Sequence, residues 1–67
     1  MDANAAAIIR CAGIARRANK GLAISVKNGK GRLMHVAYDA TGKSTSTPQT
    51  EWLDGVSLLA VVKAQLS

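Results

Sequence analysis

LAISVKNGKGRLMHVAY, residues 22–38, is the stretch that decides the fold, because two short apolar runs flank the segment Asn28-Gly29-Lys30-Gly31. Tight hairpin turns need residues that tolerate a positive φ, and Asn and Gly do so at the lowest cost. The stretch therefore predicts a β-hairpin. Its turn is cationic, because three basic side chains crowd around it: Lys27, Lys30 and Arg32.

Several registers fit this hairpin, and they differ in the length of the loop. A two-residue or a four-residue loop places Ile24 beside Leu33 or His35. A three-residue loop with a Gly bulge places Ile24 near Met34 instead. We predict the three-residue loop, because a slip of one residue would bury His35 and expose Met34 and Val36. His35 then faces solvent, where it has no partner for catalysis or metal binding.

A helix is predicted before the hairpin, over residues 3–20. Asp2 or Asn4 can cap its first turn, and a face of small apolar residues that includes Cys11 recurs with helical spacing. Gly21 stands where a left-handed residue commonly ends a helix.

After the hairpin, residues 44–47 predict a short polar strand at a sheet edge. Thr47-Pro48 then predicts the start of a second helix that runs to Leu66, since Thr is a good N-cap and Pro is tolerated at the first helical position. The fold class is therefore α+β. We predict one small domain over residues 1–67, in the order α-β-β-β-α, with a three-stranded antiparallel sheet and helices packed on it.

The net charge of +5 is unevenly distributed along the 67 residues. Residues 1–43 hold eight of the nine Lys and Arg residues, whereas residues 44–67 are slightly acidic. Such an imbalance favours an anionic partner, most commonly nucleic acid. We predict contacts to the phosphates of a DNA or RNA duplex through the first helix and the hairpin tip, in an accessory or regulatory protein. The candidate residues are Arg10, Arg16, Arg17, Lys20, Lys27, Lys30, Arg32 and Lys43.

No pattern for catalysis, a cofactor or a metal ion is found in the sequence. Cys11 is the only cysteine, so the chain cannot form an internal disulfide or a Cys-based metal site. Gly42-Lys43-Ser44-Thr45 matches only the end of a phosphate-binding loop, because Ala37 stands where that motif requires its first Gly. The apolar runs are far shorter than the ~20 residues of a membrane span, and no secretory leader is seen. We expect a cytoplasmic protein that is not an enzyme and has no small-molecule substrate.

The order α-β-β-β-α and the chain length resemble those of the double-stranded-RNA-binding domain, a family that recognises A-form shape. The resemblance is topological and covers the whole chain loosely. That family carries a Lys-rich cluster at the start of its last helix, where this sequence has the acidic segment Thr50-Glu51-Trp52-Leu53-Asp54. We therefore do not transfer its RNA specificity. We also predict no aromatic platform for single strands, because Tyr38 is expected to point inward and Trp52 to belong to the second helix.

The alternative prediction is a protein-interaction module, such as a small inhibitor or adaptor of the kind that mobile elements encode. The apolar arc of the second helix is wider than a small sheet can cover, which favours a docking face or a homodimer. Its interface residues would be Leu53, Leu58 and Val61. Packing of Leu53 or Leu58 on the first helix would explain the same pattern without a partner.

Overall fold

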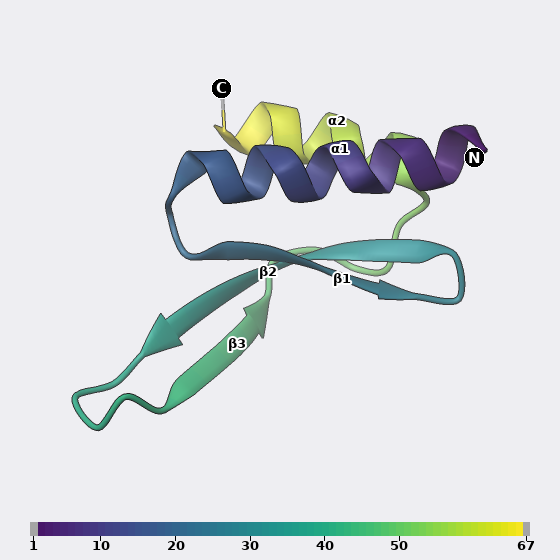
Figure 1. The fold of residues 1–67 in the computed structure, drawn as a ribbon. Helices are drawn as coiled ribbons and strands as arrows, with labels where there is room; N and C mark the ends of the chain where they lie inside the picture. Colours follow the sequence, from purple (N-terminus) through teal and green to yellow (C-terminus); the bar gives the residue numbers. More distant parts are fainter. Residues whose placement is uncertain (1, 67) are drawn as a thin grey trace.

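The computed structural model describes residues 2–66 as two helices that pack on one face of a three-stranded antiparallel sheet and cover part of it (Figure 1). The other face of the sheet is uncovered. This architecture confirms the predicted α+β class and the order α-β-β-β-α. In chain order the elements are α1 (Ala3–Ala18), β1 (Leu22–Lys27), β2 (Lys30–Tyr38), β3 (Ser44–Pro48) and α2 (Gly55–Leu66).

Helix α1 begins and ends at residues whose side chains favour helix termini. The Asp2 carboxylate accepts a hydrogen bond from the Ala5 amide at 2.6 Å, as predicted for a cap of the first turn. The helix ends at Ala18, because Asn19 adopts the left-handed conformation with φ of 53° and donates its N–H to the Arg16 carbonyl. The predicted end at residue 20 is therefore two residues too late. Asn tolerates this conformation almost as well as Gly.

The β1–β2 hairpin has a two-residue loop, so the predicted three-residue loop is wrong. Asn28 and Gly29 both have positive φ, 52° and 74°, and Lys27 pairs directly with Lys30. These are the conformations of a type I′ turn, whose twist matches that of the strands. In this register Ile24 lies opposite Leu33, and Leu33 is fully buried.

In this register the side chains of β2 that were expected to face the core lie on the other side of the sheet. Met34 and Val36 lie on the helix-free face and are half-buried, whereas His35 lies on the helix side and is exposed, as predicted. Gly31 is the helix-side residue beneath α2. A Cβ at this position would lie 2.7 Å from Leu58 Cδ2, so the buried Leu58 side chain would have to move to admit any larger residue.

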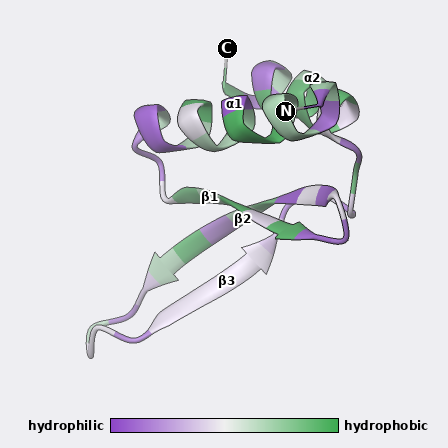
Figure 2. Ribbon diagram, turned by 45° about the vertical axis from the view of Figure 1, so that its right-hand side comes forward, coloured by the Kyte–Doolittle hydropathy of each residue, from purple (hydrophilic) through white to green (hydrophobic). Residues whose placement is uncertain are grey.

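The core lies between the helices and the sheet. Its fully buried side chains come from three elements and are Cys11, Leu33, Leu58 and Val62. α1 packs on α2 and β1, and α2 packs on β2. The helices approach closely at Gly55, where an added Cβ would collide with the Asn4 carbonyl. In Figure 2 the hydrophobic residues are concentrated in the helices and in parts of β1 and β2, whereas β3 is pale.

The second helix starts later than predicted. Pro48 ends β3 opposite Met34, and α2 begins only at Gly55. Pro is accepted at the end of an edge strand, so Thr47-Pro48 is compatible with a strand as well as with a helix start. Residues 49–54 continue along β2 instead. The Leu53 amide and carbonyl exchange hydrogen bonds of 2.8 Å with Gly31, which holds this connection against the sheet.

The far halves of β2 and β3 form an arm that no helix covers (Figure 1). β3 is exposed along its whole length. The turn at the end of the arm is organised by Asp39, whose carboxylate accepts hydrogen bonds from the amides of Thr41 and Lys43 and from the Thr41 hydroxyl. These bonds hold the pKa of Asp39 below its ordinary value, chiefly through the hydroxyl of Thr41.

Candidate nucleic-acid interface

The structure separates the predicted cations into distinct groups. Asn4 Nδ2 donates to the Gly29 carbonyl at 2.6 Å, so the hairpin tip lies against the first turn of α1. Because α1 spans 16 residues and a helix rises about 1.5 Å per residue, its last turn lies about 20 Å from that contact. The basic end of α1 and the cationic hairpin tip are therefore at opposite ends of the molecule. The predicted phosphate contacts of α1 and of the hairpin tip would therefore be made from two separate patches.

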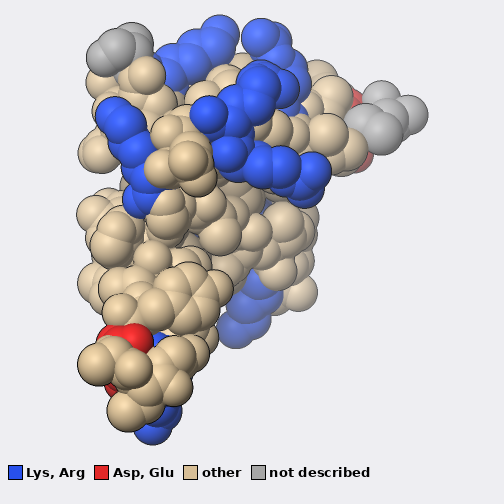
Figure 3. Space-filling view, turned by 60° about the vertical axis from the view of Figure 1, so that its left-hand side comes forward, with Lys and Arg blue, Asp and Glu red and all other residues tan. Residues whose placement is uncertain are grey.

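The first group covers the C-terminal end of the helices and consists of Arg16, Arg17, Lys20 and the last-turn Lys63 of α2. Figure 3 shows Lys and Arg side chains gathered over the helical layer, with other cations set apart on the sheet and at the end of the arm. Basic side chains in a last helical turn stabilise the helix dipole. Arg17 also covers Gly13, since its Nη1 lies 3.4 Å from the position of a Cβ there. This group therefore has a structural explanation.

The second group surrounds the hairpin turn and lies on the face of the sheet that the helices leave open. Lys27 and Lys30 are direct cross-strand partners, and Arg32 follows on the same face of β2. Like charges placed opposite each other destabilise a sheet. None of these three cations has an ion pair within residues 2–66. The hairpin tip thus gathers positive charge that no ion pair among the described residues neutralises.

Trp52 completes this group, a position that the sequence did not indicate. The Arg32 Cζ atom lies 4.7 Å from the centre of the Trp52 ring, within the range of a cation–π contact. Arg32 is held in place because its Nε donates to the Thr50 carbonyl at 3.3 Å. The Thr50 hydroxyl also accepts from the Leu33 amide at 3.2 Å, which fixes the connection beside β2. The prediction that Trp52 belongs to the second helix is wrong, because α2 begins only at Gly55, and the indole ring lies among the cations of the hairpin turn instead.

An open pocket of about 290 Å³ lies at this place, lined by Lys27, Asn28, Lys30 and Trp52. Small-molecule sites in proteins usually occupy roughly 300–1,000 Å³, so the pocket lies at the small end of that range. Its walls offer two ammonium groups, a side-chain amide and an indole ring. Such a set matches an anionic ligand that carries a planar ring. We call these residues together with Arg32 the hairpin site.

The remaining two predicted cations lie apart from the hairpin site. Arg10 is an exposed residue in the middle of α1, and Lys43 lies at the end of the β2–β3 arm. Tyr38, on the same arm, is 73% exposed, so the prediction that it points inward is wrong. It lies beyond the part of the sheet that the helices cover, where no core exists for it to join.

The predicted protein interface on the second helix is largely part of the core. Leu58 is fully buried and is not accessible to a partner. Leu53 and Val61 are half-buried, and Leu53 packs against the core cluster. The explanation that these residues pack within the chain therefore accounts for Leu53 and Leu58. The large hydrophobic residue that α2 does expose is Val56, with 62% of its surface accessible.

Metal binding and thiol chemistry would depend on the His, Cys, Asp and Glu side chains of the described residues, among which Cys11 is the single thiol. Within residues 2–66, no cluster of three or more His, Cys, Asp or Glu side chains is arranged to hold a metal ion. Cys11 is fully buried, and this burial raises the pKa of its thiol, which disfavours the reactive thiolate. Neither described helix is long and apolar enough to cross a lipid bilayer.

Comparison of the chain with protein-family models, with curated proteins and with solved structures finds no match.

Proposed function

We propose that this protein binds nucleic acid at the hairpin site. The observation that carries the proposal is the position of Trp52 beside three cations that form no ion pair within residues 2–66, on the open face of the sheet. Lys27 and Lys30 would contact phosphates, whose charge would relieve the repulsion between the two lysines. The ring of Trp52 would stack on a base.

The indole ring changes which form of nucleic acid fits best. Phosphate contacts alone suit the duplex that the charge distribution predicts. A base can reach an aromatic ring only when it is unpaired, and such stacking contributes about 1–3 kcal/mol per base. The guanidinium of Arg32 lies over one face of the ring, so a base would stack on the other face or on the outer side of the guanidinium, a plane on which unpaired RNA bases also stack. The hairpin site therefore favours a strand with unpaired bases over a fully paired duplex.

The proposal is tested by fluorescence anisotropy of a labelled single strand and of its duplex, at low and at near-physiological salt. The variant Lys27→Glu/Lys30→Glu reverses two exposed cations of the hairpin site. The matched control Arg10→Glu/Arg17→Glu reverses two exposed cations of α1 and gives the same net charge.

We expect the hairpin variant to lose affinity at least tenfold, while the α1 control loses less than about threefold. The slope of log K against log salt should fall, for each phosphate contact removed, by about 0.7 with the single strand and by about 0.9 with the duplex. Equal losses in the two variants would mean that only net charge matters, and the proposal would then fail. In a third variant, Trp52→Leu, the preference for the single strand should disappear while salt-dependent binding remains.

A further inference from the structure

The outer edge of β1 is an unpaired strand edge. β1 is an end strand of the sheet, and no other segment of residues 2–66 pairs with its outer side. The Val36 amide donates to the Gly21 carbonyl at 2.6 Å, and bonding alternates along an antiparallel strand, so odd-numbered residues of β1 bond to β2. The residues that direct their N–H and C=O groups outward are therefore Leu22, Ile24 and Val26.

The two edges of the sheet differ in how they are protected. Edge strands that must stay unpaired usually carry charged residues or Pro, which prevent another strand from adding to them. β3 fits this description, because it is made of hydroxyl residues and ends in Pro48. β1 has neither a charge nor a Pro between residues 22 and 26. Its edge is thus suited to pairing with another strand.

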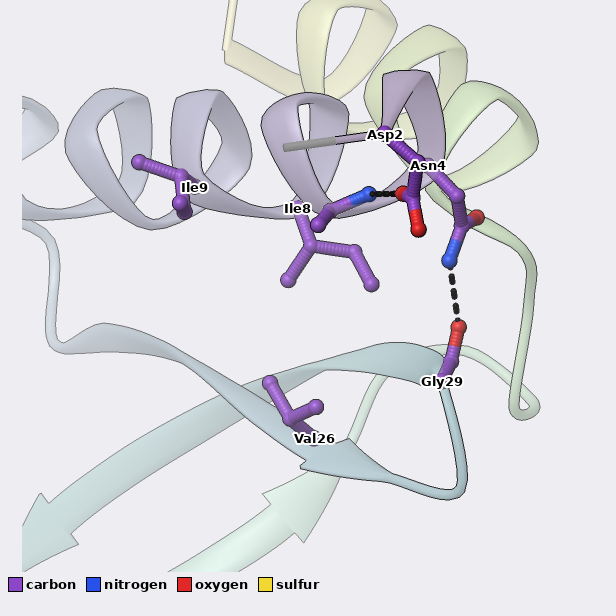
Figure 4. A pocket seen from close by; sticks show the side chains of 7 residues that line it. Asp2, Asn4, Ile8, Ile9, Val26 and Gly29 are labelled. Atoms are coloured by element: carbon purple, nitrogen blue, oxygen red, sulfur yellow. Dashed lines mark hydrogen bonds between the residues drawn. The ribbon is translucent and has the colours of Figure 1, made fainter.

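Exposed apolar side chains accompany this edge. A pocket of about 310 Å³ lies between the first turns of α1 and the end of β1. Figure 4 shows Ile8 and Val26 pointing toward each other across it, with Ile9 beside them. Ile9 is 57% and Val26 61% exposed, although both are large and aliphatic. Their burial would stabilise a complex that forms along the β1 edge.

The charges at the two ends of one face of α1 are opposite in sign, so they are complementary to those of an antiparallel second copy. Ala5, Ile9, Ala12 and Arg16 share one face of α1 at 100° per residue, and Ala5 and Ile9 line the pocket at the β1 edge. Asp2 lies at the start of this stripe and Arg16 at its end. A two-fold axis that pairs two β1 edges antiparallel would place the acidic start of one α1 toward the basic end of the other. The dipoles of the two α1 helices would then be antiparallel, which is the favourable arrangement for neighbouring helices.

We propose that a second copy of this chain pairs with the β1 edge in an antiparallel manner, so that one sheet continues through both copies. Ile24 would lie opposite Ile24 of the second copy, with Leu22 opposite Val26. All outward N–H and C=O groups of β1 would then be paired, and Ile9 and Val26 would be covered. The small alanines of the α1 stripe allow the two α1 helices to lie side by side.

The oligomeric state tests this inference, measured by sedimentation equilibrium without nucleic acid over a wide range of protein concentration. The variants are Ile9→Lys and Val26→Lys, and the matched control is Val56→Lys, an equally exposed residue on α2. We expect a dimer for the unchanged chain and for the control, and an about tenfold or greater rise of the dissociation constant in the two edge variants. A monomer at every concentration overturns the inference. A dimer that only Val56→Lys weakens also overturns it, because the interface would then lie on α2.

Amide hydrogen exchange gives a second readout that does not depend on substitutions. The amides of Ile24 and Val26 should become protected as protein concentration rises, while those of Ala23 and Ser25, which bond to β2, should not change. Concentration-independent exchange of Ile24 and Val26 would contradict pairing at this edge. The hairpin site lies on the face of the sheet opposite to the helices, whereas Ile9 and Val26 lie on the helix side. If no dimer forms, the proposal of nucleic-acid binding at the hairpin site is therefore unaffected.

Discussion

Replacement of Asn4 by Ala should destabilise the fold more than the loss of one polar side chain near the surface usually does. The Asn4 side chain joins the starts of both helices to the hairpin turn. Its Oδ1 accepts from the Gly55 amide at 2.5 Å, and its Nδ2 donates to the Gly29 carbonyl at 2.6 Å. The change Asn4→Ala removes both hydrogen bonds at once.

The expected cost follows from the surroundings of the two partners. Gly55 is buried, and a buried N–H without a partner costs about 1–3 kcal/mol. The Gly29 carbonyl is exposed and can bond to water instead, so its loss adds about 0.5 kcal/mol. The higher helix propensity of Ala compared with Asn offsets about 0.5 kcal/mol of this loss of stability. The free energy of unfolding should therefore fall by about 2 kcal/mol, a large part of the roughly 3–5 kcal/mol available to a domain of this size.

Urea denaturation followed by Trp52 fluorescence measures this effect. With a slope of about 1 kcal/mol per molar urea, the midpoint should fall by about 2 M. The control Asn4→Asp keeps the acceptor for Gly55 but turns an oxygen toward the exposed Gly29 carbonyl; because the two helix N-termini favour a carboxylate, the net cost should be only about 1 kcal/mol. The reasoning is refuted if the free energy of unfolding of Asn4→Ala lies within about 0.5 kcal/mol of that of the unchanged chain. It is also refuted if Asn4→Asp lowers this free energy as much as Asn4→Ala does.

Three other perturbations test separate parts of the structure. Leu33→Ala should lower the free energy of unfolding by about 2–5 kcal/mol and Met34→Ala by clearly less; the reverse order would mean that the hairpin register is wrong. Gly55→Ala should destabilise by about 1–2 kcal/mol, because the close contact with Asn4 outweighs the gain in helix propensity, so a more stable variant would contradict the helix packing. Because the pKa of Asp39 lies below its ordinary value of 3.8, its stabilisation of the arm is complete above that value and is lost as the pH falls through the lower one. The amide shifts of Thr41 and Lys43 in NMR spectra should titrate with a midpoint below 3.8, and a midpoint at or above it would show that these hydrogen bonds are absent.

The features that local sequence encodes were predictable. Asn28-Gly29 specifies a tight turn because both residues accept a positive φ, and Asp2 caps α1 through a contact only three residues away. The buried face of α1, which includes Cys11, follows from helical spacing alone. These elements and their order could therefore be predicted before any tertiary contact was known.

The hairpin register depends on tertiary structure, and for that reason it was predicted wrongly. Both Leu33 and Met34 begin an alternating apolar pattern in β2, and the sequence does not show where the helices end above the strand. Because β2 extends beyond the helical layer, the apolar residues near its end, such as Tyr38, do not have to face a core. The small Gly31 beneath Leu58 is the local feature that favours the observed register.

The candidate site was predicted only in part. The turn brings together Lys27, Lys30 and Arg32, as the sequence indicated. Trp52 joins them because residues 49–54 form an extended connection, although Thr47-Pro48 had predicted a helix start there. The hydrogen bonds that position this connection, such as that from Leu33 to Thr50, link residues far apart in sequence. No periodicity in the sequence reports such contacts.

The most direct test of the central claim uses Trp52, the single tryptophan of the chain, as an internal probe of the hairpin site. The protein is titrated with an unlabelled single-stranded oligonucleotide at near-physiological salt, and Trp52 emission is recorded. We expect saturable quenching with the dissociation constant found by anisotropy, and loss of that quenching in Lys27→Glu/Lys30→Glu. Binding seen by anisotropy with unchanged Trp52 emission would contradict the account, because the nucleic acid would then lie elsewhere on the protein.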